Sequence, residues 1–190
     1  MNVRMLAGAL ALTLAAGAPV LAQDNSMSSG SMKANPMVGG AAMSSQKTIV
    51  ANAANSKDHT TLVSLVKKAD LVATLSGPGP FTVFAPTNEA FAKIPQATLT
   101  AVGDDKAMLT KVLTYHVVAG MLDSAAIAAK IKDGGGKAML TTVQGESLTA
   151  MMNGNKLVLT DAHGGQSTVT IADVYQSNGV IHVVDTVLMP

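Results

Sequence analysis

The feature that most constrains this sequence is a change of hydrophobic period along its 190 residues. In the first part, apolar residues recur at helical spacing, as between Leu62 and Ala69, with two short strand-like runs between the helical segments. After Gly134-Gly135-Gly136 they alternate with polar residues, and turn signals such as Asn153-Gly154 separate the runs. Helices that precede strands joined by tight turns predict an α+β domain with a mainly antiparallel sheet.

The same patterns set the expected bounds of the elements. Helix-capping side chains are expected at Asp58 or Thr60, at Thr87 after the strand-stopping Pro86, and at Asp123 or Ser124. The expected helices are 49–55, 62–69, 87–93, 104–114 and 124–133, and the expected strands are 81–85, 115–119, 148–152, 156–160, 168–171 and 180–188.

The composition decides what the core is made of. Hydrophobic residues make up 48% of the chain and charged residues 13%, so a folded core is expected. There is no Trp and only five aromatic residues, so Val, Leu, Ile, Ala and Met must fill that core. The chain has no Cys, which excludes disulfides, cysteine-ligated metals and thiol nucleophiles.

Residues 1–22 have the pattern of a secretory signal peptide. Arg4 precedes the apolar run Met5–Ala16, and Val20-Leu21-Ala22 places small residues before a cleavage site after Ala22. A membrane anchor is the alternative, but the run is short for a hydrocarbon layer of about 30 Å. We therefore expect a product that is secreted, periplasmic or held at the cell surface, without stable membrane insertion.

Cleavage would also remove the only arginine of the chain. Without Arg4, 12 of the 13 basic residues remain against 12 acidic ones, so the mature chain is neutral. Proteins bind nucleic acids through a positively charged surface and through the bidentate guanidinium group of arginine, and this chain would offer neither. A nucleic-acid partner is therefore not expected.

Residues 23–46 are rich in Ser, Gly and Met and are expected to be flexible, ahead of a domain at 47–190. Met27, Met32, Met37 and Met43 allow two interpretations. They could form an arm that holds Cu(I) through thioethers, or they could be incidental residues of a spacer, some of them packing on the domain. The irregular spacing and the lack of His in this segment favour the spacer.

The sequence contains no recognisable catalytic motif. No nucleophile elbow, phosphate loop, dinucleotide-binding turn or zinc-protease helix is present, so we expect no enzyme activity and no cofactor. His116 and His182 lie in apolar runs and are expected to be buried and neutral, with metal ligation together with Asp185 as the alternative. His59 and His163 are expected at exposed positions.

Three segments, in order, are similar to the signatures of the fasciclin domain family. They are Phe81–Phe91, Leu113–Val118 with its Tyr-His pair, and Asn178–Leu188. The resemblance covers about Pro36 to Pro190. It implies a wedge-shaped β-sandwich with helices packed against it, an extracellular adhesion or matrix role, and no general catalytic activity.

The resemblance also implies candidate binding residues. In animal members, the Tyr-His region and an acidic-aliphatic segment have been linked to integrin binding, and these map onto Tyr115 and His116 and onto Asp173, Val174 and Tyr175. Only Asp173 and Val174 match the second segment. Of the five, the two tyrosines and Asp173 are expected to be exposed.

Two functions follow. The first is a secreted adhesion module that contacts a surface or matrix protein or a polysaccharide. The alternative, since some family members bind carotenoids, is a carrier of a carotenoid or lipid. Flexible methionines would suit its pocket, and the candidates are Met108, Met121, Met151 and Met152.

Overall fold

The computed structural model describes residues 36–190, which lie within one compact unit, Lys33–Pro190. The expected signal peptide and the first part of the expected flexible segment lie outside the described residues. The helices are α1 Ile49–Ala53, the 3-10 helix η1 Lys57–His59, α2 Thr60–Lys68, α3 Val72–Ser76, α4 Asn88–Ala92, α5 Gln96–Asp104, α6 Lys106–Tyr115 and α7 Ser124–Asp133. The strands are β1 Met37–Val38, β2 Ala41–Ala42, β3 Phe81–Pro86, β4 Val117–Ala119, β5 Lys137–Thr141, β6 Ser147–Asn153, β7 Lys156–Thr160, β8 Gln166–Gln176 and β9 Gly179–Val184.

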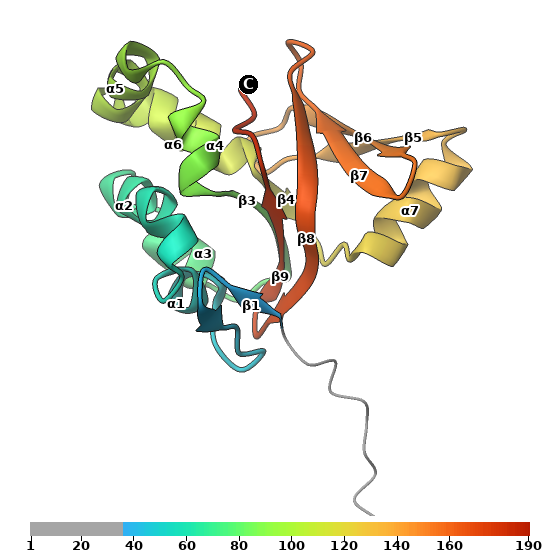
Figure 1. Cartoon of the computed structure of the whole chain (residues 1–190), viewed down its shortest axis with the longest axis horizontal. Helices are drawn as coiled ribbons and strands as arrows, with labels where there is room; N and C mark the ends of the chain where they lie inside the picture. The colour runs from blue at the N-terminus through green and yellow to red at the C-terminus, as the bar shows by residue number, and fades with distance from the viewer. Residues whose placement is uncertain (1–35) are drawn as a thin grey trace, which may run out of the picture. The chain divides into compact units, whose positions relative to one another are not determined.

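Seven strands form one sheet in the order β4-β3-β9-β8-β7-β6-β5. Only β3 and β9 pair in parallel, so the mainly antiparallel sheet of the α+β prediction is confirmed. The two ends of the sheet approach one another, because Val118 bridges Thr142 and the Val143 N–H donates to the Val117 carbonyl at 2.7 Å. The sheet is therefore nearly closed, and Figure 1 shows helices α1–α6 on one side of β9 and β3.

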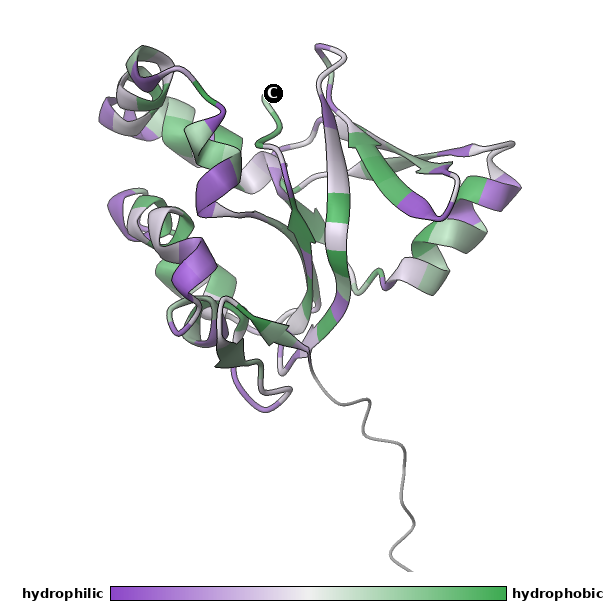
Figure 2. Cartoon of the chain, in the orientation of Figure 1, coloured by the Kyte–Doolittle hydropathy of each residue, from purple (hydrophilic) through white to green (hydrophobic). Residues whose placement is uncertain are grey.

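The central strands β3 and β9 are buried on both faces, which explains why their sequences are almost continuously apolar. Val83 and Ile181 belong to a core shared with helices α1, α2 and α6. Phe84 and Val184 belong to a second core, formed with α7 and strands β5–β7. Figure 2 shows hydrophobic residues along the inner strands and polar residues toward the outer faces of the helices.

Most expected elements are present, and the differences have local causes. Thr87 and Asp123 cap α4 and α7 as predicted, but α2 follows directly on η1 and has no side-chain cap at Asp58 or Thr60. Tyr115, expected in a strand, is the last residue of α6, where its ring is buried. The sequence patterns did not predict helices α3 and α5 or strand β5, because segments this short show no clear hydrophobic period.

The compact unit of the structure extends further toward the N-terminus than the expected boundary at residue 47. Residues 37–42 form the small β1–β2 hairpin, and Val38 and Met43 are 2% and 5% exposed in the first core. The Lys57 N–H donates to the Gly39 carbonyl at 3.2 Å, which ties this hairpin to η1. The end of the expected flexible segment is thus part of the domain.

Candidate functional site

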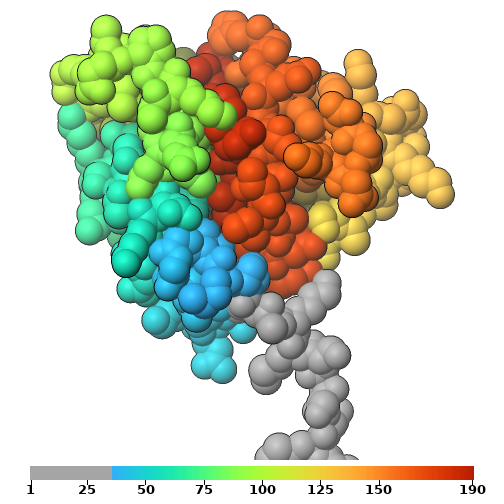
Figure 3. Space-filling view, in the orientation of Figure 1, coloured from blue at the N-terminus to red at the C-terminus, as the bar shows by residue number. Residues whose placement is uncertain are grey.

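A groove opens between helix α7, the β6–β7 hairpin and strand β8. Its volume is about 670 Å³, within the range of about 300–1,000 Å³ typical of ligand sites. Figure 3 shows this face, with β8 and β7 in orange and α7 in yellow. The residues that line it include Ala125 and Ala128 of α7, Lys156 and Leu157 of β7, and Val169 and Thr170 of β8.

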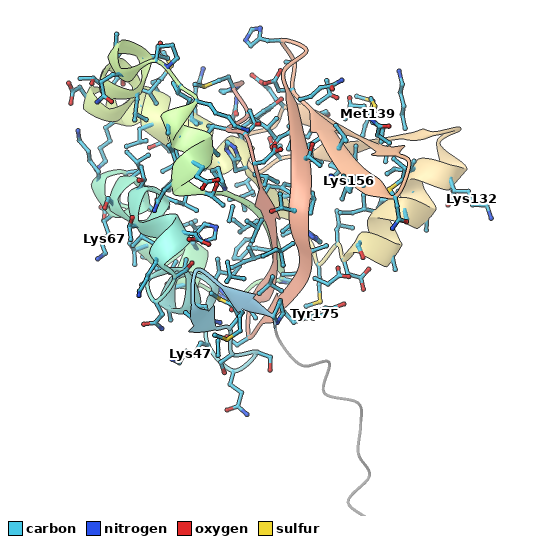
Figure 4. All side chains as sticks on the ribbon, viewed as in Figure 1. Lys47, Lys67, Lys132, Met139, Lys156 and Tyr175 are labelled. Atoms are coloured by element: carbon cyan, nitrogen blue, oxygen red, sulfur yellow. The ribbon has the colours of Figure 1, made fainter. Side chains whose placement is uncertain are left out.

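One end of the groove is fixed by hydrogen bonds at the start of α7. Asp173 Oδ1 accepts from the Ser124 N–H at 2.6 Å, and Asp173 Oδ2 accepts from the Ser124 hydroxyl at 2.5 Å. Asp123 caps the helix by accepting from the Ala126 N–H at 2.8 Å, and the Tyr175 hydroxyl donates to its other oxygen at 3.2 Å. We call Asp123, Ser124, Asp173 and Tyr175 the α7 cap cluster; Figure 4 labels Tyr175 near the end of β8.

Asp173 holds an unusual backbone conformation, with φ at +59°. Aspartate and asparagine tolerate this left-handed region better than other side-chain-bearing residues. The position lies within the second of two register shifts of the β8–β9 ladder, between Ile171 and Val174, so β8 bends here. Asp173 therefore positions α7 against a bent strand, a role that the sequence did not reveal.

The α7 cap cluster lies next to His182. A serine, an aspartate and a histidine are therefore close together, but they are not arranged as the catalytic triad of a hydrolase. His182 Nδ1 accepts from the Asp173 N–H at 3.4 Å, and its Nε2 is 2.8 Å from the Leu122 carbonyl, to which it donates. The Ser124 hydroxyl donates to the Asp173 carboxylate. Because neither imidazole nitrogen faces Ser124, the ring cannot act as its general base.

Three of the five predicted binding residues lie in the core. Tyr115 and Val174 are 0% exposed and His116 is 3% exposed, so the expectation that Tyr115 is exposed was wrong. The Tyr115 hydroxyl accepts from the Ala162 N–H at 3.2 Å. Asp173 and Tyr175 are partly exposed and meet in the α7 cap cluster, so they alone among the five remain candidates for contact with a partner.

His116 and His182 are buried, as predicted. His116 Nδ1 donates to the Val112 carbonyl at 2.8 Å, and its Nε2 accepts from the Leu188 N–H at 3.0 Å. Burial lowers the pKa of both imidazoles, although the carbonyls of Val112 and Leu122 partly offset this. The neutral form of each ring is therefore favoured.

His59, expected at an exposed position, is 3% exposed. Its Nδ1 lies 2.9 Å from the Ser56 hydroxyl. Burial lowers the pKa of this ring too, while the Ala85 carbonyl and the Asp58 carboxylate act in the opposite direction. His163 is exposed as expected, with Nε2 at 3.0 Å from the Pro190 carbonyl.

The methionines considered for an apolar ligand do not form a shared pocket. Met108, Met121 and Met152 are 41–50% exposed, and of the four candidates only Met152 lines the groove. An apolar hollow between helices α1–α3 and strand β3 has a volume of about 30 Å³, room for one or two molecules the size of water. A carotenoid or lipid chain would not fit there.

Within residues 36–190, no group of three or more His, Cys, Asp or Glu side chains is arranged to hold a metal ion. In particular, His116 and His182 are engaged with main-chain groups, and Asp185 accepts from the Thr168 N–H at 2.9 Å. The ligand set considered for these residues is thus not assembled.

This fold belongs to a known class. The chain is a member of the fasciclin domain family, whose domain matches residues 57–190. The family is known for adhesion-related extracellular proteins, and its members are generally not enzymes.

Among relatives, Protein sll1483 of Synechocystis sp. is 44% identical over 81% of this chain and 79% of its own length. The cell surface glycolipoprotein MPB83 of Mycobacterium bovis is 34% identical over 80% of this chain and 64% of its own length. A solved FAS1 domain pair from the insect cell adhesion molecule Fasciclin I aligns with a TM-score of 0.54 and 24% identity, over 67% of this chain and 44% of that one. That last similarity shows the fold alone.

The relatives include a protein named for the cell surface. In the part of the chain that the structure describes, no helix has the length and apolarity that crossing a bilayer requires.

We expect Asp173→Ala to lower the free energy of unfolding by about 2 kcal/mol, because alanine is strained at positive φ and Ser124 loses its acceptor. Asp173→Asn should cost less than half as much, since asparagine tolerates this conformation and keeps one amide oxygen. Urea unfolding of both variants checks this, and equal losses would contradict it. Asp173→Ala is therefore a poor probe of binding alone.

Proposed function

We propose that the protein is an extracellular binding module of the adhesion type, exported to the periplasm or cell surface after cleavage near Ala22. Its partner would be a surface or matrix protein or a polysaccharide. Membership of the fasciclin family and the cell-surface relative support this proposal.

The observation that carries the proposal is that, in the part of the chain that the structure describes, no ionisable group with a shifted pKa lines the groove. Among residues 36–190, the groups with shifted pKa values are His59, Tyr115, His116 and His182, all of them 3% exposed or less. None of them lines the groove. Perturbed groups gather in the clefts of enzymes, whereas here burial in the core perturbs them. The side chains that line the groove therefore suit contact with a partner better than acid–base catalysis.

Tyr175 is the most direct probe of this function. We expect Tyr175→Ala to weaken binding of the mature protein to isolated envelopes of the producing cells several-fold, because a partly exposed tyrosine offers a large contact area and a polar tip. The melting temperature should change little. Binding is measured by sedimentation of labelled protein with the envelopes.

Ser177→Ala is the matched control, because Ser177 is an exposed residue just beyond the same strand. It should bind as the wild type does. Unchanged binding of Tyr175→Ala would remove Tyr175 from the contact surface, and a wild-type protein that binds neither envelopes nor secreted polymer would contradict the adhesion function itself.

A further inference from the structure

Strands β7 and β8 pair over only part of their length. The ladder joins Thr160 to Gln166, Leu159 to Ser167 and Val158 to Thr168, and ends there. In Figure 1 the two strands lie together near the turn that connects them and diverge toward α7. The groove occupies the region beyond the last pair.

The residues that would continue the ladder form the opposite walls of the groove. With unchanged register, Leu157 would lie opposite Val169 and Lys156 opposite Thr170, and all four line the groove instead. On their outer sides the same strands remain paired, β7 with β6 through Leu157–Met152 and β8 with β9 through Val169–Val184. Each wall is thus a strand with a neighbour on one side and the groove on the other.

The separation of β7 from β8 has a structural cause. The two register shifts in β8 and the left-handed Asp173 make β8 follow β9, and Ser124 fastens that bend to the start of α7. Helix α7 in turn packs on β5 and β6. The gap between β7 and β8 is therefore held open by hydrogen bonds and packing.

A strand edge of this kind offers main-chain N–H and C=O groups, which favour the addition of an extended peptide. The side chains suit such an occupant: Ala125 and Ala128 leave space, and Leu157 and Val169 supply apolar contact. Two charged side chains line the groove. Asp185 accepts from the Thr168 N–H, whereas Lys156 is exposed and forms no ion pair with any described residue, so a carboxylate can approach Lys156. No aromatic ring lines the groove, so it lacks the stacking platform that suits a sugar.

We propose that the gap between β7 and β8 binds an extended, acidic peptide segment of a partner protein, which adds main-chain hydrogen bonds to the exposed edge of one or both strands. This inference rests on the proposed binding function and names its partner class. It places the principal contact in the groove, with the α7 cap cluster, which includes Tyr175, at one end.

The test begins with random linear peptides displayed on phage and selected on the mature wild-type protein. Enriched peptides are synthesised and their affinities measured by calorimetry. We expect them to carry an acidic residue and to lose about tenfold or more in affinity when alternate backbone nitrogens are methylated, because methylation removes the donors that pair with a strand edge.

Three variants, one of them a control, locate the peptide. Ala125→Trp fills the groove from an exposed position of α7 and should weaken peptide binding about tenfold or more. Ala129→Trp makes the same change at an exposed position of α7 that does not line the groove, and it should bind as the wild type does. Lys156→Glu is a second, independent block, expected to reduce the affinity for acidic peptides.

The proposal is overturned if no peptide is enriched, if the methylated peptides bind unchanged, or if Ala125→Trp and Lys156→Glu bind peptide as the wild type does. It is also overturned if a polysaccharide array yields a ligand that Ala125→Trp blocks while peptides fail. Envelope binding by the wild type in any of these cases would preserve the adhesion function and refute only the peptide site.

Discussion

The free energy of unfolding is expected to fall as the pH is lowered from about 6.5 to about 5. Burial lowers the pKa values of His59, His116 and His182 from the usual 6.5. In the unfolded chain these rings regain ordinary pKa values, so below about pH 6.5 the unfolded state binds more protons than the folded state. The stabilisation is complete above the unfolded pKa and is lost as the pH falls toward the folded ones.

The size of this effect follows from the number of rings. Three extra protons on the unfolded chain, the most that these rings can contribute, correspond to a slope of at most about 4 kcal/mol per pH unit, against a typical total stability of about 5–15 kcal/mol. Protonation of His116 would also place an N–H on Nε2, which now accepts from the Leu188 N–H. Urea unfolding at several pH values measures the slope.

A total slope of less than about 1.4 kcal/mol per pH unit between about pH 6.5 and 5.5 would correspond to less than one proton. That result would contradict the burial of three neutral rings.

Gly179→Ala is expected to lower the free energy of unfolding by about 3 kcal/mol or more. A Cβ at Gly179 would lie 2.0 Å from the Phe81 carbonyl oxygen and 2.9 Å from its carbonyl carbon. These are main-chain atoms of the residue that pairs with Gly179 in the parallel β3–β9 ladder. Neither strand can move without disturbing the two cores that enclose them, so the clash must open the ladder.

Gly103→Ala provides the matched comparison. Gly103 lies in helix α5, and the nearest atom to an added Cβ is the Lys68 Nζ at 4.0 Å. Alanine should therefore stabilise the protein by about 0.5–1 kcal/mol, the usual difference between the two residues in a helix. Thermal and urea unfolding distinguish the two variants, and a loss of under about 0.5 kcal/mol for Gly179→Ala would refute the predicted clash.

Features that depend on a few neighbouring residues could be predicted from the sequence. The Thr87 and Asp123 caps, strands β3 and β9 and the burial of His116 and His182 could be predicted, because capping residues and apolar runs act over a few positions. Tyr115 was misplaced because its ring is buried through contacts made far along the chain, including the Ala162 N–H.

The candidate site could be predicted only in part. Asp173 and Tyr175 were recognised by resemblance, but their partners Ser124 and Asp123 lie about fifty positions earlier in the chain. The groove-lining residues Lys156 and Thr170 carry no motif, and no local signal marks them. Only the register at which β7 and β8 stop pairing brings them face to face.

Sequence alone therefore determined the α+β class, the family resemblance and the burial of His116 and His182, since these follow from side-chain chemistry and short-range periodicity. The tertiary structure decided that Asp173 holds α7 in place, that Tyr115 lies in the core and that a groove separates β7 from β8. These features depend on which distant segments meet and in which register, and a bend in one strand sets that register.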